Sequence, residues 1–136
     1  MSKSDTFEND LMKFIFQGTA LPAGYAGPYY VALYTADPGE AGTATTNEAT
    51  YTSYARQSIA RTSGGFAVTT NTATNVSQIN FPQCTGGTNT LTHFAIVTTA
   101  SGAGIILYSG TLSSSLAVSN GITPQIAASA MSVSED

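Results

Sequence analysis

Two residues in the second half of the chain, Cys84 and His93, are the first candidates for side-chain chemistry. A thiol and an imidazole can form a nucleophilic pair, but such a pair needs a third group that orients the imidazole. No helix N-terminus follows Cys84 to lower the pKa of its thiol. His93 lies in a strand-like segment with apolar neighbours, which is typical of a hydrogen-bonded structural histidine. We therefore expect a buried or loop cysteine and a cross-strand histidine.

The carboxylates do not form a pattern that indicates catalysis or metal binding. Asp37 and Glu40 lie three apart in an Asp-Pro-Gly-Glu segment, which is typical of a turn. Glycoside hydrolysis needs two carboxylates fixed in a cleft, and a metal site needs several donors at suitable spacing. A single cysteine excludes a disulfide framework and a zinc cluster. The sequence predicts a protein that is not an enzyme and has no cofactor and no metal site.

Charge is distributed unevenly along the chain. All twelve charged residues lie between positions 3 and 61 or at positions 135 and 136, and the net charge is −4. This balance does not attract a phosphate backbone or an anionic lipid surface, so nucleic acid and membrane are poor candidate partners. Soluble domains usually intersperse charges and protect strand edges with lysine. Two interpretations of residues 62–134 remain open: edges covered by the chain's own loops, or a surface covered by other copies or other proteins.

Residues 5–17 have the pattern of one amphipathic helix. Asp5 is the expected N-cap, Glu8 follows at the spacing of a capping box, and Gly18 is the expected C-cap. Four apolar side chains share one face of this helix: Phe7, Leu11, Phe14 and Ile15. This face packs either on the protein's own sheet or, as an arm, on a neighbouring subunit.

The rest of the chain has the pattern of an all-β protein. After a Gly/Pro loop at 18–28, the expected strands cover residues 29–35, 51–62, 66–70, 76–81, 91–98, 105–109, 112–118 and 122–133. Ser63-Gly64-Gly65 and Asn120-Gly121 predict hairpin turns. The segment 91–98 is apolar at successive positions, as in a strand buried on both faces.

This spacing predicts one all-β domain over residues 1–136. It comprises a helical arm at 5–17 and a β-sandwich or jelly roll of about eight short strands at 29–133.

Two arginines, Arg56 and Arg61, are the only cations beyond the first 13 residues. In an extended strand they point to opposite faces, because they are five positions apart. One is expected to pair with Asp37, Glu40 or Glu48, and the other is free for an intersubunit contact, where arginine is enriched. The candidate assembly contacts are therefore Phe7, Leu11, Phe14, Ile15, Arg56 and Arg61.

Five segments together resemble a known family. They are Met1-Ser-Lys-Ser-Asp-Thr-Phe-Glu-Asn-Asp-Leu11, Tyr30-Val-Ala-Leu-Tyr-Thr-Ala-Asp-Pro-Gly-Glu-Ala-Gly-Thr43, Tyr54-Ala-Arg-Gln-Ser-Ile-Ala-Arg61, Thr92-His-Phe-Ala-Ile96 and Val118-Ser-Asn-Gly-Ile-Thr-Pro124. In this order they resemble a family of small bacteriophage virion proteins, over nearly the whole chain. Members are commonly labelled tail fibre proteins, and several look like capsid cement or decoration proteins that sit as β-sandwich oligomers on an HK97-type shell.

The resemblance implies a structural role in the virion. We expect a cement or decoration protein on the capsid surface, with the major capsid protein and further copies of itself (a dimer or trimer) as partners. The alternative is a tail or tail-fibre component involved in host attachment. A small enzyme or sugar-binding module is the third hypothesis, which the lack of tryptophan disfavours. The polar N-terminus lacks the apolar region of a signal peptide, so we expect folding in the bacterial cytoplasm.

Overall fold

The computed structural model describes residues 2–136 and consists mostly of antiparallel strands. One α-helix, α1 (Asp5–Gln17), is followed by a short 3₁₀ helix, η1 (Ala23–Ala26). The strands are β1 (Ser2–Lys3), β2 (Tyr29–Tyr34), β3 (Gln57–Ile59), β4 (Phe66–Thr69), β5 (Thr72–Asn75), β6 (Ile79–Asn80), β7 (Asn89–Val97), β8 (Ile106–Val118), β9 (Gln125–Ile126) and β10 (Ser132–Ser134). The prediction of an all-β fold with one N-terminal helix is confirmed.

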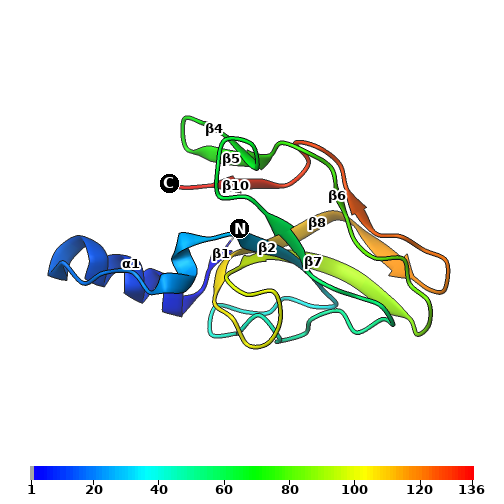
Figure 1. Ribbon diagram of the computed structural model, residues 1–136. Helices are drawn as coiled ribbons and strands as arrows, with labels where there is room; N and C mark the ends of the chain where they lie inside the picture. Colours follow the sequence, from blue (N-terminus) through cyan, green and yellow to red (C-terminus); the bar gives the residue numbers. More distant parts are fainter. Residues whose placement is uncertain (1) are drawn as a thin grey trace.

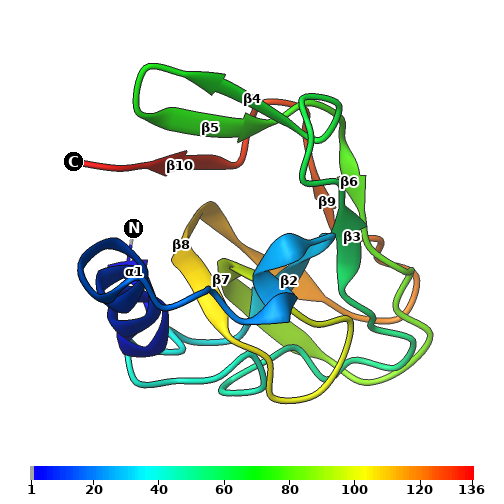
Figure 2. The same cartoon turned by 60° about the vertical axis from the view of Figure 1, so that its left-hand side comes forward.

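Three sheets make up the body. The largest has the strand order β1-β8-β7-β2-β3, the second has the order β10-β5-β4, and β6 pairs with β9. Figure 1 and Figure 2 show the three-stranded sheet standing over the five-stranded sheet, with β6 and β9 along one side. The two larger sheets therefore face each other, and α1 lies outside them.

The two central strands of the large sheet are buried on both faces. In β2, Val31 and Leu33 belong to the main core cluster between the sheets. Ala32 and Tyr34 alternate with them and belong to a second cluster on the other face. The neighbouring β7 contributes to both clusters in the same way. The prediction that the segment 91–98 is buried on both faces is confirmed.

The predicted hairpins are wrong, although the turns exist. At Asn120-Gly121 the chain reverses, and Ile122 N–H donates to Ser119 O at 3.0 Å. The strand that follows, β9, pairs with β6 and not with β8. At Ser63-Gly64-Gly65 the chain leaves β3, which pairs with β2, and enters β4, which pairs with β5. These turns move the chain between sheets, because burial against another sheet outweighs the local preference for a hairpin.

Strand boundaries differ from the prediction in several places. Of the expected strand at 51–62 only β3 forms, so Arg56 and Arg61 lie outside it, and the expected strand at 122–133 is divided into β9 and β10. The segments 105–109 and 112–118 form one long strand, β8, which bends at a register shift opposite Leu91 and His93. The expected strand at 76–81 is reduced to β6, and β5 forms just before it, where no strand was expected. The sequence of β5, Thr-Ala-Thr-Asn, has little apolar content, so its pairing with β4 is not visible in the hydrophobic pattern.

Ser4, and not Asp5, is the N-cap of α1. Its backbone is extended (φ −77°, ψ 149°) and its hydroxyl accepts a hydrogen bond from Phe7 N–H at 3.2 Å. The same hydroxyl donates to Ile106 O on β8, so the cap also fastens the helix start to the large sheet. The predicted C-cap is confirmed, since Gly18 has the left-handed φ of 67° that glycine adopts without strain.

Candidate assembly surface

The first half of α1 is anchored to the body through aromatic contacts. The ring of Phe7 lies 5.6 Å from the ring of Tyr25, nearly parallel to it, and 5.6 Å from the ring of Tyr108, edge-on. The Tyr25 hydroxyl donates to Asp10 at 2.7 Å. Burial, together with this carboxylate, raises the pKa of Tyr25, so the hydroxyl keeps its proton as a donor. Leu11, four residues after Phe7, is half-buried.

The second half of α1 projects from the body (Figure 1). Four large apolar residues here are 50–73% exposed: Met12, Phe14, Ile15 and Phe16. We call these four residues the arm ridge. The predicted stripe is thus divided along the helix: Phe7 and Leu11 are half-buried, whereas Phe14 and Ile15, further along, are exposed.

Met12 and Phe16 were missing from the sequence-based contacts. They are four residues apart and therefore share a face, and they continue the apolar arc past Ile15. Their i, i+4 spacing is the signal in the sequence that identifies them.

Arg56 is an internal residue, so its assignment as an assembly contact is wrong. It is 7% exposed, and its guanidinium donates to both carboxylate oxygens of Glu48. Further bonds reach the carbonyls of Ala44, Thr99 and Gly102, on two loops that cover one end of the large sheet. Burial acts to lower the pKa of Arg56, but the hydrogen bond and charge of Glu48 outweigh it and raise the pKa. Arg56 is therefore the arginine with the predicted internal partner.

Arg61 remains on the surface. It is exposed, and its guanidinium has only a long contact of 3.5 Å with Ala26 O. Within residues 2–136 it makes no ion pair. Its side chain lines the mouth of a groove between the two larger sheets.

This intersheet groove is mostly apolar and has a volume of about 520 Å³. Val68 on β4, Ala73 on β5 and Val133 on β10 form a row across one wall, because Ala73 is in register with both valines. Ile96 and Leu107 from the large sheet line the opposite wall. The remaining lining residues are Tyr29, Arg61, Thr62, Ser63, Phe66 and Tyr108.

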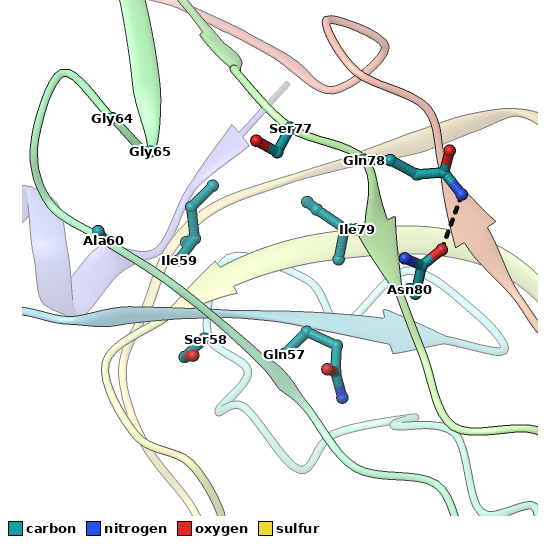
Figure 3. Close-up of a pocket in the computed structure, with 10 residues that line it drawn as sticks. All are labelled: Gln57, Ser58, Ile59, Ala60, Gly64, Gly65, Ser77, Gln78, Ile79 and Asn80. Atoms are coloured by element: carbon teal, nitrogen blue, oxygen red, sulfur yellow. Dashed lines mark hydrogen bonds between the residues drawn. The ribbon is translucent and has the colours of Figure 1, made fainter.

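A second pocket, of about 370 Å³, separates the edge strand β3 from β6. Figure 3 shows Ile59 and Ile79 facing one another there, with Gln78 donating to Asn80 at 2.7 Å. The lining side chains are neutral, so the pocket offers amides and hydroxyls for hydrogen bonds and no acid–base pair.

Cys84 and His93, the two candidates for nucleophilic chemistry, have the surroundings of residues with a structural role. Cys84 is fully buried, and its thiol donates to Gly86 O at 3.2 Å. His93 lies in β7, where its Nδ1 shares a hydrogen bond of 2.8 Å with the hydroxyl of Thr92. Within the described part of the chain, no three His, Cys, Asp or Glu side chains gather to hold a metal ion.

The carboxylates of Asp37 and Glu40 also form hydrogen bonds that have a structural role. Asp37 accepts a hydrogen bond from Gly39 N–H at 2.9 Å, which confirms the predicted turn. Glu40 accepts from the hydroxyl of Ser2 at 2.9 Å, beside the pairing of β1 with β8. Both carboxylates thus stabilise loops at the base of α1.

Comparison with known proteins indicates the family of this chain. A search of curated proteins found no significant match. None of the helices in residues 2–136 is both long and apolar enough to cross a membrane. Residues 2–134 match the family described as "Podophage GP4 fiber I protein gp80", which confirms the resemblance to small phage virion proteins. This match covers almost every residue that forms the sheets and the arm, and the chain therefore belongs to the podophage GP4 fiber I protein gp80 family of phage virion structural proteins.

Proposed function

We propose that this protein is a non-catalytic, fibre-type component of a bacteriophage tail, held in the particle through its α1 arm. The observation that carries the proposal is the arm ridge, four large apolar side chains that the protein's own sheets leave uncovered. An exposed apolar patch of this kind marks a protein–protein contact. The family description names a fibre, which favours the tail over other positions in the virion.

The body of the protein supports a structural role in a second way. Between Thr62 and Ser134, where no charged residue occurs, long stretches of polar surface are exposed, including Ser113, Ser114 and Ser115 on β8. The outer edge of β8 pairs with β1 only at Tyr108 and Ser109. A long uncharged strand edge is suited to contact with other proteins in an assembly, where neighbours protect it from aggregation.

A capsid cement or decoration role is the second candidate. The compact body without a repeated fibre motif favours it, because a cement protein spreads a compact fold over capsomer boundaries. The same uncharged surface then faces the major capsid protein. Many weak contacts in a symmetric shell give strong attachment through avidity.

Copy number and position in the particle distinguish the two candidates. Cryo-EM of the virion, together with a stained gel of purified particles, measures both. Density restricted to the tail with a few to tens of copies supports the tail-fibre role, whereas hundreds of copies on the head overturn it and support cement. In either case, particles assembled with a chain lacking residues 5–17 are expected to lose this protein. Normal incorporation of the shortened chain contradicts the role of the arm.

A further inference from the structure

The intersheet groove is a part of the core that the chain itself does not close. Val68, Ala73 and Val133 lie on the same face of the three-stranded sheet, the face that looks toward Ile96 and Leu107. Val133 is 7% exposed, whereas Val68 is 70% exposed. The space between the two larger sheets is therefore filled at β10 and open to solvent at β4. Val68 and the apolar walls of the groove together form an exposed apolar surface of the kind that another element covers.

The chain presents one apolar element of suitable size for such a surface, the arm ridge. Within one copy the ridge cannot reach the groove. Ser4 and Phe7 fasten the first turn of α1 to β8, and from there the helix points away from the body (Figure 1). Each copy therefore carries an uncovered helix face and an uncovered groove that do not meet.

We propose that the arm ridge of one copy packs into the intersheet groove of a second copy. This inference rests on the proposed function, because it names the partner of the arm. The contact joins two different surfaces, so it is head-to-tail, and a closed ring of two or three copies leaves no groove empty. Ring closure distinguishes this arrangement from an open filament.

The areas involved indicate a small contact. With about 200 Å² for each fully exposed side chain, the four ridge residues leave on the order of 450 Å² uncovered. The groove exposes less surface than the ridge, and Phe14 and Phe16 lie on opposite sides of the helix, so the contact is smaller than ~1,000 Å² and belongs to the weak, transient class of interfaces. A groove of about 520 Å³ also lies within the size range of sites that hold several apolar groups.

The charges on the two surfaces are complementary. Arg61 is the one charged side chain in the groove lining, and it makes no ion pair within the described residues. On α1, Glu8 is exposed and stands on the same side as Met12 and Ile15, four and seven residues further along. A helix entering the groove thus brings an unpaired carboxylate toward an unpaired guanidinium, a pairing that selects one orientation.

The first test uses two variants that disrupt opposite surfaces. Phe16→Asp places a charge on the ridge and Val68→Asp places one at the groove mouth; both positions are more than two-thirds exposed, so the fold is retained. Size-exclusion chromatography coupled to light scattering measures the mass of the full-length protein. We expect a wild-type dimer or trimer, and each variant alone to associate at least about tenfold more weakly. An equimolar mixture of the two variants is expected to form a one-to-one pair, because one intact ridge then meets one intact groove.

The second test exchanges the charges. Glu8→Arg and Arg61→Glu are each expected to weaken association several-fold, and the double variant is expected to restore it. A wild-type protein that stays monomeric at high concentration overturns the inference. So does an oligomer that Phe16→Asp disrupts while Val68→Asp leaves it intact, because the arms then bind each other. If the purified protein is monomeric but loss of the arm still prevents incorporation into particles, the inference fails and the proposed function stands.

Discussion

Arg56 and Glu48 are joined by two parallel hydrogen bonds, from Nε to Oε1 at 2.6 Å and from Nη2 to Oε2 at 2.9 Å. This fork is the strong geometry of an arginine–carboxylate pair. Tyr54 also donates to Glu48, at 3.1 Å, and the same Tyr54 oxygen accepts from Leu33 N–H in β2. The pair thus connects the loops at one end of the large sheet to its central strand.

Replacing Arg56 by alanine is expected to lower the free energy of unfolding by about 3 kcal/mol, because the largely buried Glu48 loses its charged partner. Arg61→Ala is the matched control. Its side chain is exposed, and we expect a change within about 0.5 kcal/mol. Urea unfolding followed by circular dichroism in dilute protein measures both. Equal effects of the two substitutions contradict the internal role of Arg56.

The cap of α1 gives a second prediction. Ser4→Ala removes the acceptor for Phe7 N–H and the donor to Ile106 O, so we expect a loss of about 1–2 kcal/mol. Asp5→Ala is expected to cost no more than about 0.5 kcal/mol, through the helix dipole alone. The same unfolding experiment compares the two variants. A larger effect at Asp5 means that the helix starts one residue later than described.

The aromatic anchor of the arm gives a third prediction. Phe7→Ala is expected to destabilise the protein by roughly 1–3 kcal/mol, because the half-buried ring contacts both Tyr25 and Tyr108. We also expect faster proteolysis within α1, since the helix loses its hold on the body. Phe16→Ala, in dilute protein where copies do not associate, is expected to change stability by less than about 0.5 kcal/mol. If proteolysis within α1 is no faster in Phe7→Ala than in the wild type, Phe7 does not anchor the helix to the body.

The sequence predicts those elements whose pattern is local. The apolar period of α1, the strand at β2 and the two-faced apolar run of β7 follow from the local sequence, and the structure has all three. Turn chemistry at Asn120-Gly121 predicts where the chain reverses but not which strand it then joins. That choice depends on Ile126 and Ile79 being buried together, which is a long-range relationship.

The candidate assembly surface could also be predicted only in part, because it depends on long-range contacts. An extended strand through residues 51–62 predicts that Arg56 and Arg61 point to opposite faces, but only β3 forms between them, and the burial of Arg56 depends on the loop that carries Glu48. The helical period predicts that Phe7 and Ile15 lie on the same side of α1. It does not predict how far along the helix the contact with the body extends, and this extent determines which apolar residues are exposed. The groove at Val68 has no local signature, because it forms between strands that are far apart in the chain.

The end of the chain gives a prediction that depends on pH. Glu135 accepts hydrogen bonds from the Tyr108 hydroxyl and, at 2.9 Å, from the Lys3 ammonium. The Tyr108 bond and then Lys3 hold the pKa of Glu135 below its usual range in the folded protein. A carboxylate with a lowered folded-state pKa adds stability above its unfolded pKa, about 4.3, and loses it as the pH falls through the folded value.

Glu135→Gln is therefore expected to have a lower melting temperature than the wild type at pH 6–7, and the difference should disappear as the pH falls below about 4. Thermal unfolding at a series of pH values measures this. Because the Glu135 side chain is 44% exposed, added salt should reduce the Lys3 contribution. The Tyr108 hydrogen bond is less sensitive to salt, so part of the difference at neutral pH should persist. A difference between the two proteins that does not change with pH means that Glu135 contributes through its shape and not through its charge.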